Sequence, residues 1–320
     1  MNTALRPMST GEVLDRTFHL YRNHFLLFSG ISVGQVVFLV LGILAVIPMG
    51  ALLPLSNFNS VDPFTILGTF GVYSLIIFLF FGAGYAIVLG ATVYAVSKVH
   101  LGQPATIRAS YREIRPLVLR TLRIVLSVFI RYVGTVILSY LVVIVVGAVL
   151  IPNLVRAVGG ALPTYVAWML VASLLGLFVA GMVLAVRIYC RYSLAVPACL
   201  LERLPARQAM KRSKWLSKGA LGRIFLVFLL MAILTAGLTY ALQIPVFFLS
   251  ALDANVLIIV CQLLGMFIAI TVAAPISTIS VCLMYYDQRV RKEAFDLQLM
   301  MEAVGQQSHV QTATAAPPIA

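Results

Sequence analysis

Residues 206–250 read ARQAMKRSKWLSKGALGRIFLVFLLMAILTAGLTYALQIPVFFLS, a basic segment followed directly by a long apolar run. The part from Arg207 to Arg223 holds six positive charges in seventeen residues. A helix rises about 1.5 Å per residue, so roughly 20 apolar residues cross the ~30 Å hydrocarbon core of a membrane. The stretch therefore predicts a membrane-spanning helix that follows a positively charged segment at the membrane surface.

The whole chain has the composition of a membrane protein. Of its 320 residues, 62% are hydrophobic and 10% are charged, whereas about a quarter of the residues in soluble domains are charged. The net charge of +13 would suit a nucleic-acid binder in a soluble protein. Here the charges flank apolar spans, so we expect membrane lipid as the partner and no nucleic acid. The four cysteines lie in or beside apolar segments without metal-ligand spacing, and we expect no metal site.

Six apolar segments are long enough to span a membrane as helices. We place them at about 25–51, 65–97, 117–150, 164–195, 221–251 and 255–286. They are rich in Leu, Val, Ile, Gly and Ala without strict alternation, which favours helices over barrel strands. The predicted fold is an all-α polytopic membrane protein. We expect a single transmembrane domain over residues 1–303, ending in a helix that continues to 303, and a disordered tail over 304–320.

The basic residues predict the orientation of the spans. The loops at about 52–64, 151–163 and 252–254 hold one basic residue, Arg156, and the other 22 of the 23 lie toward the opposite ends of the spans. By the positive-inside rule both termini are cytoplasmic. Glu12 and Asp15 lie where a signal peptide would need an apolar core, so we expect no removable signal peptide.

Each odd-numbered span follows a segment of related character. These segments are TGEVLDRTFHLYRNHF at 10–25, TIRASYREIRPLVLR at 106–120 and ARQAMKRSKWLSKGAL at 206–221. Placing Arg16, Arg112 and Arg212 in register gives periods of 96 and 100 residues. The pattern predicts a threefold repeat of an amphipathic cytoplasmic elbow helix and a helical hairpin, with the first elbow at 9–24.

The second and third elbows have the one-sided patterns of helices that lie on a membrane surface. In the second, one face holds Ile107, Tyr111, Ile114 and Val118. In the third, one face holds Arg207, Lys211, Lys214 and Lys218. We interpret this third face as a membrane-surface basic helix on the inner leaflet, with Trp215 and Leu216 reaching toward lipid. A GxxxG pair in the first span, Gly30 and Gly34, predicts close helix packing.

Three segments, together with the spacing of the six spans, resemble a known family. They are LRPMSTGEVLDRTFHLYRNHF, PACLLERLPARQAMKRSKWLSKGALGRIF and LMYYDQRVRKEAFDLQL. The chain resembles, over nearly its whole length, bacterial proteins of the glycerophosphoryl diester phosphodiesterase membrane-domain type, a family largely without assigned function. The resemblance implies a multi-pass protein of a bacterial inner membrane. The family name comes from larger members fused to a phosphodiesterase barrel of about 250 residues, for which this sequence has no segment of sufficient length.

Ionisable residues near the spans are the candidate site. Arg131 lies about eight residues inside the third span, and RIYCRY places Arg187, Tyr189, Arg191 and Tyr192 near the cytoplasmic end of the fourth. One interpretation is a pocket for an anionic lipid headgroup or another anionic ligand, because guanidinium groups match phosphate geometry. The other is that Arg131 snorkels to the interface while the tyrosines form an aromatic belt.

The sequence shows no catalytic motif. Glu12, Asp15 and His19 form the one acidic and imidazole cluster, which fits the solvated face of a surface helix. We expect no enzyme activity and no cofactor. The hypothesis is a structural or accessory role that uses anionic lipid and a partner membrane protein. The alternative is a transporter or lipid-handling permease with an anionic site near Arg131 and Arg187.

Overall fold

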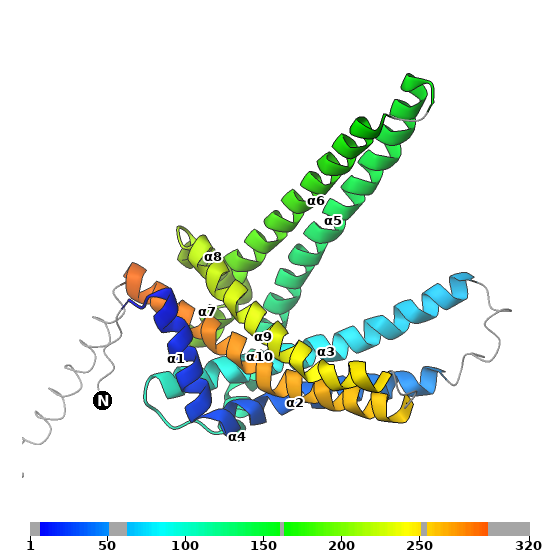
Figure 1. The fold of residues 1–320 in the computed structure, drawn as a ribbon. Coiled ribbons are helices and arrows are strands. Elements are labelled where there is room, and N and C mark those ends of the chain that lie inside the picture. The colour runs from blue at the N-terminus through cyan, green and yellow to red at the C-terminus, as the bar shows by residue number, and fades with distance from the viewer. Residues whose placement is uncertain (1–6, 51–62, 161–162, 251–254, 294–320) are drawn as a thin grey trace, which may run out of the picture.

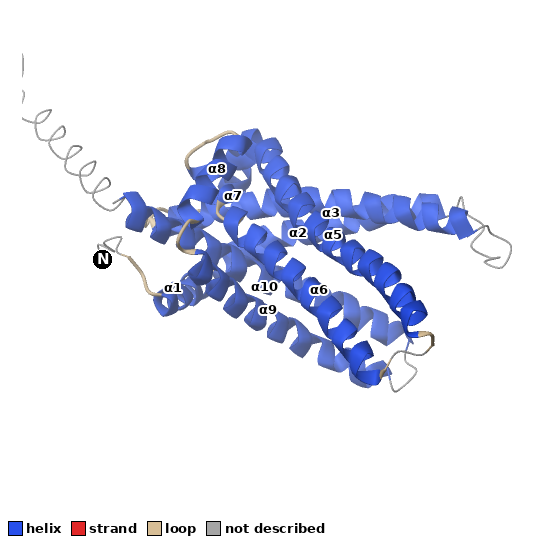
Figure 2. Ribbon diagram, turned by 90° about the horizontal axis from the view of Figure 1, so that it is seen from above, coloured by secondary structure: helices blue, strands red, loops and turns tan. Residues whose placement is uncertain are grey.

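The computed structural model of the chain describes residues 7–50, 63–160, 163–250 and 255–293 (Figure 1). Every regular element in these residues is a helix (Figure 2). Six of the helices are long and apolar enough to cross a membrane. They are α2 (Phe25–Gly50), α3 (Pro63–His100), α5 (Val118–Val158), α6 (Thr164–Tyr192), α9 (Leu221–Ser250) and α10 (Asn255–Glu293). The prediction of an all-α protein with six spans is confirmed.

Shorter helices lie before each pair of long ones. They are α1 (Thr10–Asn23), α4 (Ile107–Ile114) with the 3-10 turn η2 (Arg115–Leu117), α7 (Ala195–Leu201) and α8 (Ala206–Ser217). Helix α7 was not expected as a separate element. The chain turns at residues 193–194, so the fourth span ends before Pro197, and α7 is buried along most of its length. The predicted C-terminal helix continues as α10 to Glu293, and residues 294–320 lie outside the described part of the chain.

The six long helices form three hairpins, of which two pack together and one diverges. Contacts between α2 and α10 and between α3 and α10 join the α2–α3 and α9–α10 hairpins. The α5–α6 hairpin points away from them (Figure 1). In α5 and α6, 6% of the most apolar stretch is buried, against 33% in α2 and 17% in α3, α9 and α10. Most of the α5–α6 surface is therefore left for lipid or another protein to cover.

The GxxxG pair of α2 packs closely, as predicted, and its partner is the short helix α4. A Cβ at Gly30 would lie 2.6 Å from Cδ1 of Ile107, and one at Gly34 would collide with the hydroxyl of Tyr111. That hydroxyl donates to the carbonyl of Ile31 at 2.5 Å. The apolar face of α4 is therefore used for packing against protein, although we expected it to lie on lipid.

Helices α1 and α8 bury equivalent positions. Helix α1 buries Val13, Thr17, Leu20 and Tyr21, and α8 buries Ala209, Ser213, Leu216 and Ser217. Each residue of the second set follows its counterpart by 196 positions, which is the offset between Arg16 and Arg212. This burial supports the repeat for the first and third copies, and the threefold repeat itself stays a prediction. It also corrects the expectation for Leu216, which is fully buried in protein and does not reach toward lipid.

Candidate functional site

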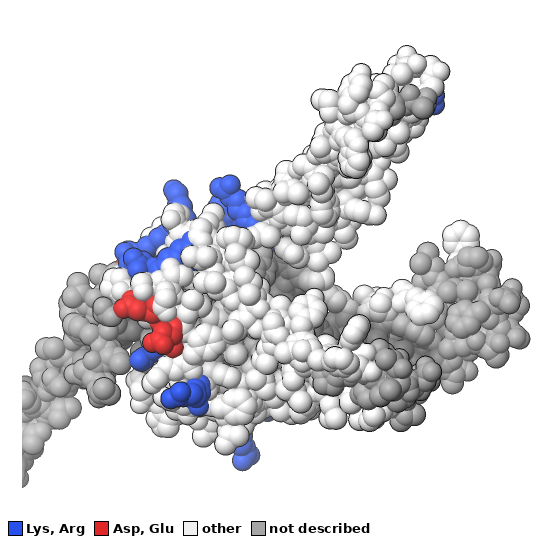
Figure 3. Space-filling model, viewed as in Figure 1, with Lys and Arg blue, Asp and Glu red and all other residues white. Residues whose placement is uncertain are grey.

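Charged residues gather at the end of the bundle where α1, α4, α7 and α8 lie, here called the basic end. Figure 3 shows Lys and Arg over this end, with acidic atoms beside them, and one basic patch at the far tip of the α5–α6 hairpin. Arg156, in the last turn of α5, accounts for that distant patch. The polar groups of the basic end form two neighbouring clusters, which both use residues of α10, and one exposed basic face.

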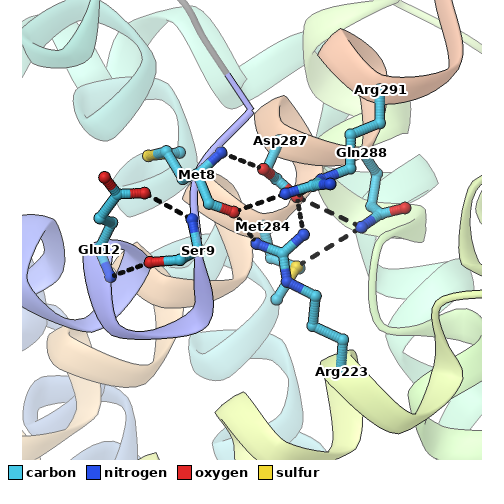
Figure 4. Close-up of polar contacts among 8 residues, drawn as sticks. All are labelled: Met8, Ser9, Glu12, Arg223, Met284, Asp287, Gln288 and Arg291. Atoms are coloured by element: carbon cyan, nitrogen blue, oxygen red, sulfur yellow. Dashed lines mark hydrogen bonds and ion pairs between the residues drawn. The ribbon is translucent and has the colours of Figure 1, made fainter.

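The first cluster surrounds Asp287, whose side chain is fully buried (Figure 4). Arg223 at the start of α9 donates to Oδ2 from Nη1 at 2.6 Å, and Arg291 donates to the same oxygen from Nε at 3.0 Å. The backbone N–H of Met8 donates to Oδ1 at 2.8 Å. Gln288 adds a longer contact to Oδ2 at 3.4 Å. We call these five residues the Asp287 cluster.

Main-chain atoms of Met8 complete this cluster. Both arginines donate to the Met8 carbonyl, Arg291 at 2.7 Å and Arg223 at a shorter distance. Ser9 then caps α1: its hydroxyl accepts from the N–H of Glu12 at 3.2 Å, and the Glu12 carboxylate accepts from the N–H of Ser9 at 2.6 Å. Such a capping box fixes the start of a helix. Glu12, predicted in an acidic and imidazole cluster, thus has a structural contact.

The second cluster surrounds Glu202, just after α7. Its carboxylate accepts from Nε of Arg212 at 3.0 Å and from the Tyr285 hydroxyl at 2.6 Å. Arg212 also pairs with Glu293, and Arg289 pairs with Glu293 at 3.0 Å. Burial acts to lower the pKa of Arg212, but the charges and hydrogen bonds of Glu202 and Glu293 outweigh burial and raise that pKa. These five residues form the Glu202 cluster, which joins α8 to α10.

Trp215 strengthens the same junction from the exposed side. Two cations lie over its ring, Arg212 and Lys292, each 5.2 Å from the ring centroid. The Lys292 ammonium also donates to the carbonyls of Trp215 and Lys218 at 2.7 Å. A cation at the C-terminal carbonyls of a helix is favourable because those groups have no partner within the helix. Helix α8 is therefore held against α10 at its end.

The predicted basic face of α8 is exposed. Arg207, Lys211, Lys214 and Lys218 all point outward, opposite the buried face of the helix. Within the described part of the chain none of these four side chains has an ion-pair partner. The positive charge of this face is thus not neutralised by any carboxylate in the described residues.

The structure brings together two of the five residues predicted for the anionic site. The Arg131 guanidinium lies over the Tyr192 ring, 5.4 Å from its centroid, and donates to the Ser127 carbonyl of its own helix at 3.0 Å. Arg131 and Arg187 are both exposed, and the contacts among the described residues do not join them. The exposure of Arg131 agrees better with snorkelling than with an enclosed pocket.

The other predicted residues have separate surroundings. Tyr189 packs against Tyr132, with centroids 6.0 Å apart, and against Phe228 of α9 at 5.3 Å. The backbone carbonyl of Arg191 accepts from the hydroxyls of Ser213 at 2.9 Å and Ser217 at 3.2 Å. Tyr189 thus links the base of the divergent hairpin to α9, and Arg191 links it to α8.

The sequence alone did not lead us to predict the Asp287 cluster or the Glu202 cluster. Asp287 and Arg291, and likewise Arg289 and Glu293, are spaced i,i+4 just beyond an apolar run, a spacing that permits ion pairs on one helix. The three segments quoted for the family resemblance supply all members of the Asp287 and Glu202 clusters. Residues in those segments therefore hold the basic end together.

Fold and charge together define a polytopic α-helical membrane protein with a basic end. The chain matches no family model, no curated protein and no solved structure.

Proposed function

We propose that this chain has a structural or accessory role in a bacterial inner membrane, where it binds anionic lipid of the inner leaflet through the basic face of α8. A partner membrane protein belongs to the proposal, and a catalytic centre, metal or cofactor does not. The observation that supports it is the outward direction of Arg207, Lys211, Lys214 and Lys218 on a helix whose other face is fixed in protein. Each such charge contributes about 1 kcal/mol near an anionic membrane surface.

The distribution of carboxylates supports this assignment. In the described residues Glu202, Asp287 and Glu293 are bound in the two clusters, and Glu113 pairs with Arg203. None of these four contacts reaches the outer face of α8. The carboxylates described for this chain therefore leave that face without counter-ions, and a phosphate-rich leaflet supplies them without requiring a fixed ligand geometry.

The test compares lipid retained by the full-length protein. The protein is reconstituted in nanodiscs of phosphatidylglycerol and phosphatidylcholine, transferred to mild detergent and weighed by native mass spectrometry. Replacing Arg207, Lys211, Lys214 and Lys218 together by Gln should remove most retained phosphatidylglycerol. The matched control keeps the charge, with Arg207→Lys and the three lysines changed to Arg, and should retain it. Equal retention by the Gln variant contradicts the proposal.

A lipid-handling permease is the second candidate, and the observation in its favour is the position of Arg131. Arg131 of α5 and Tyr192, the last residue of α6, lie together in the part of the divergent α5–α6 hairpin nearer the basic end. A permease would move labelled phosphatidylglycerol between leaflets of proteoliposomes, and Arg131→Gln with Arg187→Gln would slow that movement. The accessory role predicts no protein-dependent movement with either form.

Membership of the glycerophosphoryl diester phosphodiesterase membrane-domain family is part of the proposal. Its support is that the three segments that resemble the family meet at the basic end and supply its ion-pair clusters. Segments that stabilise a fold in this way carry no implication of phosphodiesterase chemistry.

A further inference from the structure

Among the described residues, the buried side-chain oxygens without a hydrogen-bond partner include three on the facing helices α2 and α10. They are Oγ of Ser32 and Oε1 of Gln35 on α2, and Oγ1 of Thr271 on α10. Ser32 is 1% exposed, Gln35 4% and Thr271 8%. Buried polar groups are paired in the great majority of cases, and in a membrane an unpaired one is especially unfavourable. These three atoms therefore point to a bound hydrogen-bonding molecule.

The register between α3 and α10 places Thr271 along the bundle. Cys282 approaches the carbonyl of Val93 at 3.9 Å, and the Tyr286 hydroxyl lies 2.8 Å from that of Ser97. Both pairs are 189 positions apart, so the two helices run in the same direction with a constant offset. The same offset puts Thr271 level with Gly82.

Gln35 lies at that same level. Its Nε2 donates to the carbonyl of Phe81, the residue before Gly82, at 3.2 Å. Ser32 is one turn earlier on α2. Ser29 lies one further turn toward the start of α2, and its Oγ is 3.3 Å from the Tyr21 hydroxyl. That hydroxyl also donates to the carbonyl of Val272 on α10 at 2.8 Å. Helices α2, α3 and α10 therefore converge on one region that holds all three unpaired oxygens.

Gly82 provides room in this region. It lies 11 positions before Val93, which is three turns of helix, so both residues share the face of α3 that meets α10. A Cβ built on Gly82 would meet no atom within 4 Å. The space beside half-buried Gly82 is therefore open, next to the Phe81 carbonyl to which Gln35 donates. Gln35 is ten residues from the start of α2, about 15 Å along its axis, which is near the middle of a ~30 Å hydrocarbon core.

We infer that this region binds ordered water, shared by Ser32, Gln35 and Thr271. The three atoms are neutral, and two of them are hydroxyls that both donate and accept, which suits water better than a metal cation. The nearest described carboxylate on α10, Asp287, is 16 residues further on, about 24 Å along the helix. We call this region the hydration site. The proposal of a hydration site does not depend on lipid binding at α8. The hydration site lies on α2 and α10, whereas Arg131 and Arg187 lie on α5 and α6.

The test uses the full-length protein in detergent and a double-mutant cycle. Ser32→Ala and Thr271→Val should each lower the melting temperature by about 2 °C. The melting temperature of the double variant should fall by clearly less than the sum of the two single decreases, because the two residues, on different helices, share one ligand. The matched control, Thr278→Val, removes a hydroxyl on α10 that already donates to the Ala274 carbonyl at 3.4 Å, and it should couple to neither change.

A second measurement reports the water directly. X-ray radiolysis of bound water oxidises adjacent side chains, so peptides containing Phe81 and Val272 should be labelled in the native protein. Additive or stabilising effects of Ser32→Ala and Thr271→Val overturn the inference, and so does an unlabelled native protein.

Discussion

The carboxylate of Asp287 accepts a hydrogen bond from the backbone N–H of Met8, although the two residues are 279 positions apart. Asp287 lies near the end of the last long helix, and Met8 lies just before the first helix. Arg223 donates to both residues and adds the start of α9. These contacts join the segment before α1 to both helices of the α9–α10 hairpin at the basic end.

We predict that Asp287→Asn destabilises the protein by about 3 kcal/mol, because it leaves two arginines without their buried counter-charge. Arg223 has a side-chain exposure of 20%, so water compensates it only in part. The measurement is reversible unfolding of the reconstituted protein. Asp15→Asn, an exposed carboxylate on α1, is the matched control and should change stability little. Similar losses for the two variants would show that the cluster has no special role.

The Glu202 cluster should be far more sensitive than an exposed ion pair of the same chemistry. Glu202→Gln should lower stability by about 2 kcal/mol, because Arg212 and Tyr285 both donate to the carboxylate. Glu113→Gln breaks the pair with Arg203, whose side chain is 76% exposed, and should lower stability by less than about 1 kcal/mol. Thermal unfolding of the two variants in the same detergent gives the comparison. Equal shifts would contradict the assigned difference in burial.

The packing of α4 into α2 gives a third prediction. Gly34→Ala should destabilise the fold because the new methyl group collides with the Tyr111 hydroxyl. Tyr111→Phe removes that hydroxyl, so the double variant should recover part of the loss. Gly176→Ala is the control, since a Cβ there meets nothing within 4 Å, and it should stabilise the helix by up to about 1 kcal/mol. Absence of recovery in the double variant would contradict the proposed contact.

The six spans were predictable from the sequence because length and apolar composition decide whether a segment crosses a membrane. The outward face of α8 was also predictable, since Arg207, Lys211, Lys214 and Lys218 share one side of any regular helix. Such properties depend on neighbours in sequence. The ends of the helices were less predictable. We expected the fourth span to reach residue 195, but the chain turns at residues 193–194 and then begins a separate buried helix.

Contacts between distant segments could not be predicted in this way. Nothing local to Asp287 indicates Met8 or Arg223 as its partners, because the pairing depends on how the hairpins pack. The same holds for Leu216. Its position beside Trp215 suggested contact with lipid, but α8 packs against protein and buries it. Gln35 and Thr271 also become a candidate site only through the register of α3 and α10. The predicted anionic site depends on such contacts as well, and of its members the structure joins Arg131 with Tyr192.

The last prediction concerns the sides of the membrane. If the basic end is cytoplasmic, as the positive-inside rule predicts, the tip of the α5–α6 hairpin lies outside. Ala157→Cys at that tip and Gln208→Cys on α8 are both exposed positions on helices, so they differ mainly in side. In intact cells an impermeant thiol reagent should label Ala157→Cys, while Gln208→Cys should react only after permeabilisation. The native chain is the control, because Cys190, Cys199 and Cys282 are buried and Cys261 is partly so. Labelling of Gln208→Cys in sealed cells would reverse the orientation and place the α8 basic face away from the leaflet that the proposed function requires.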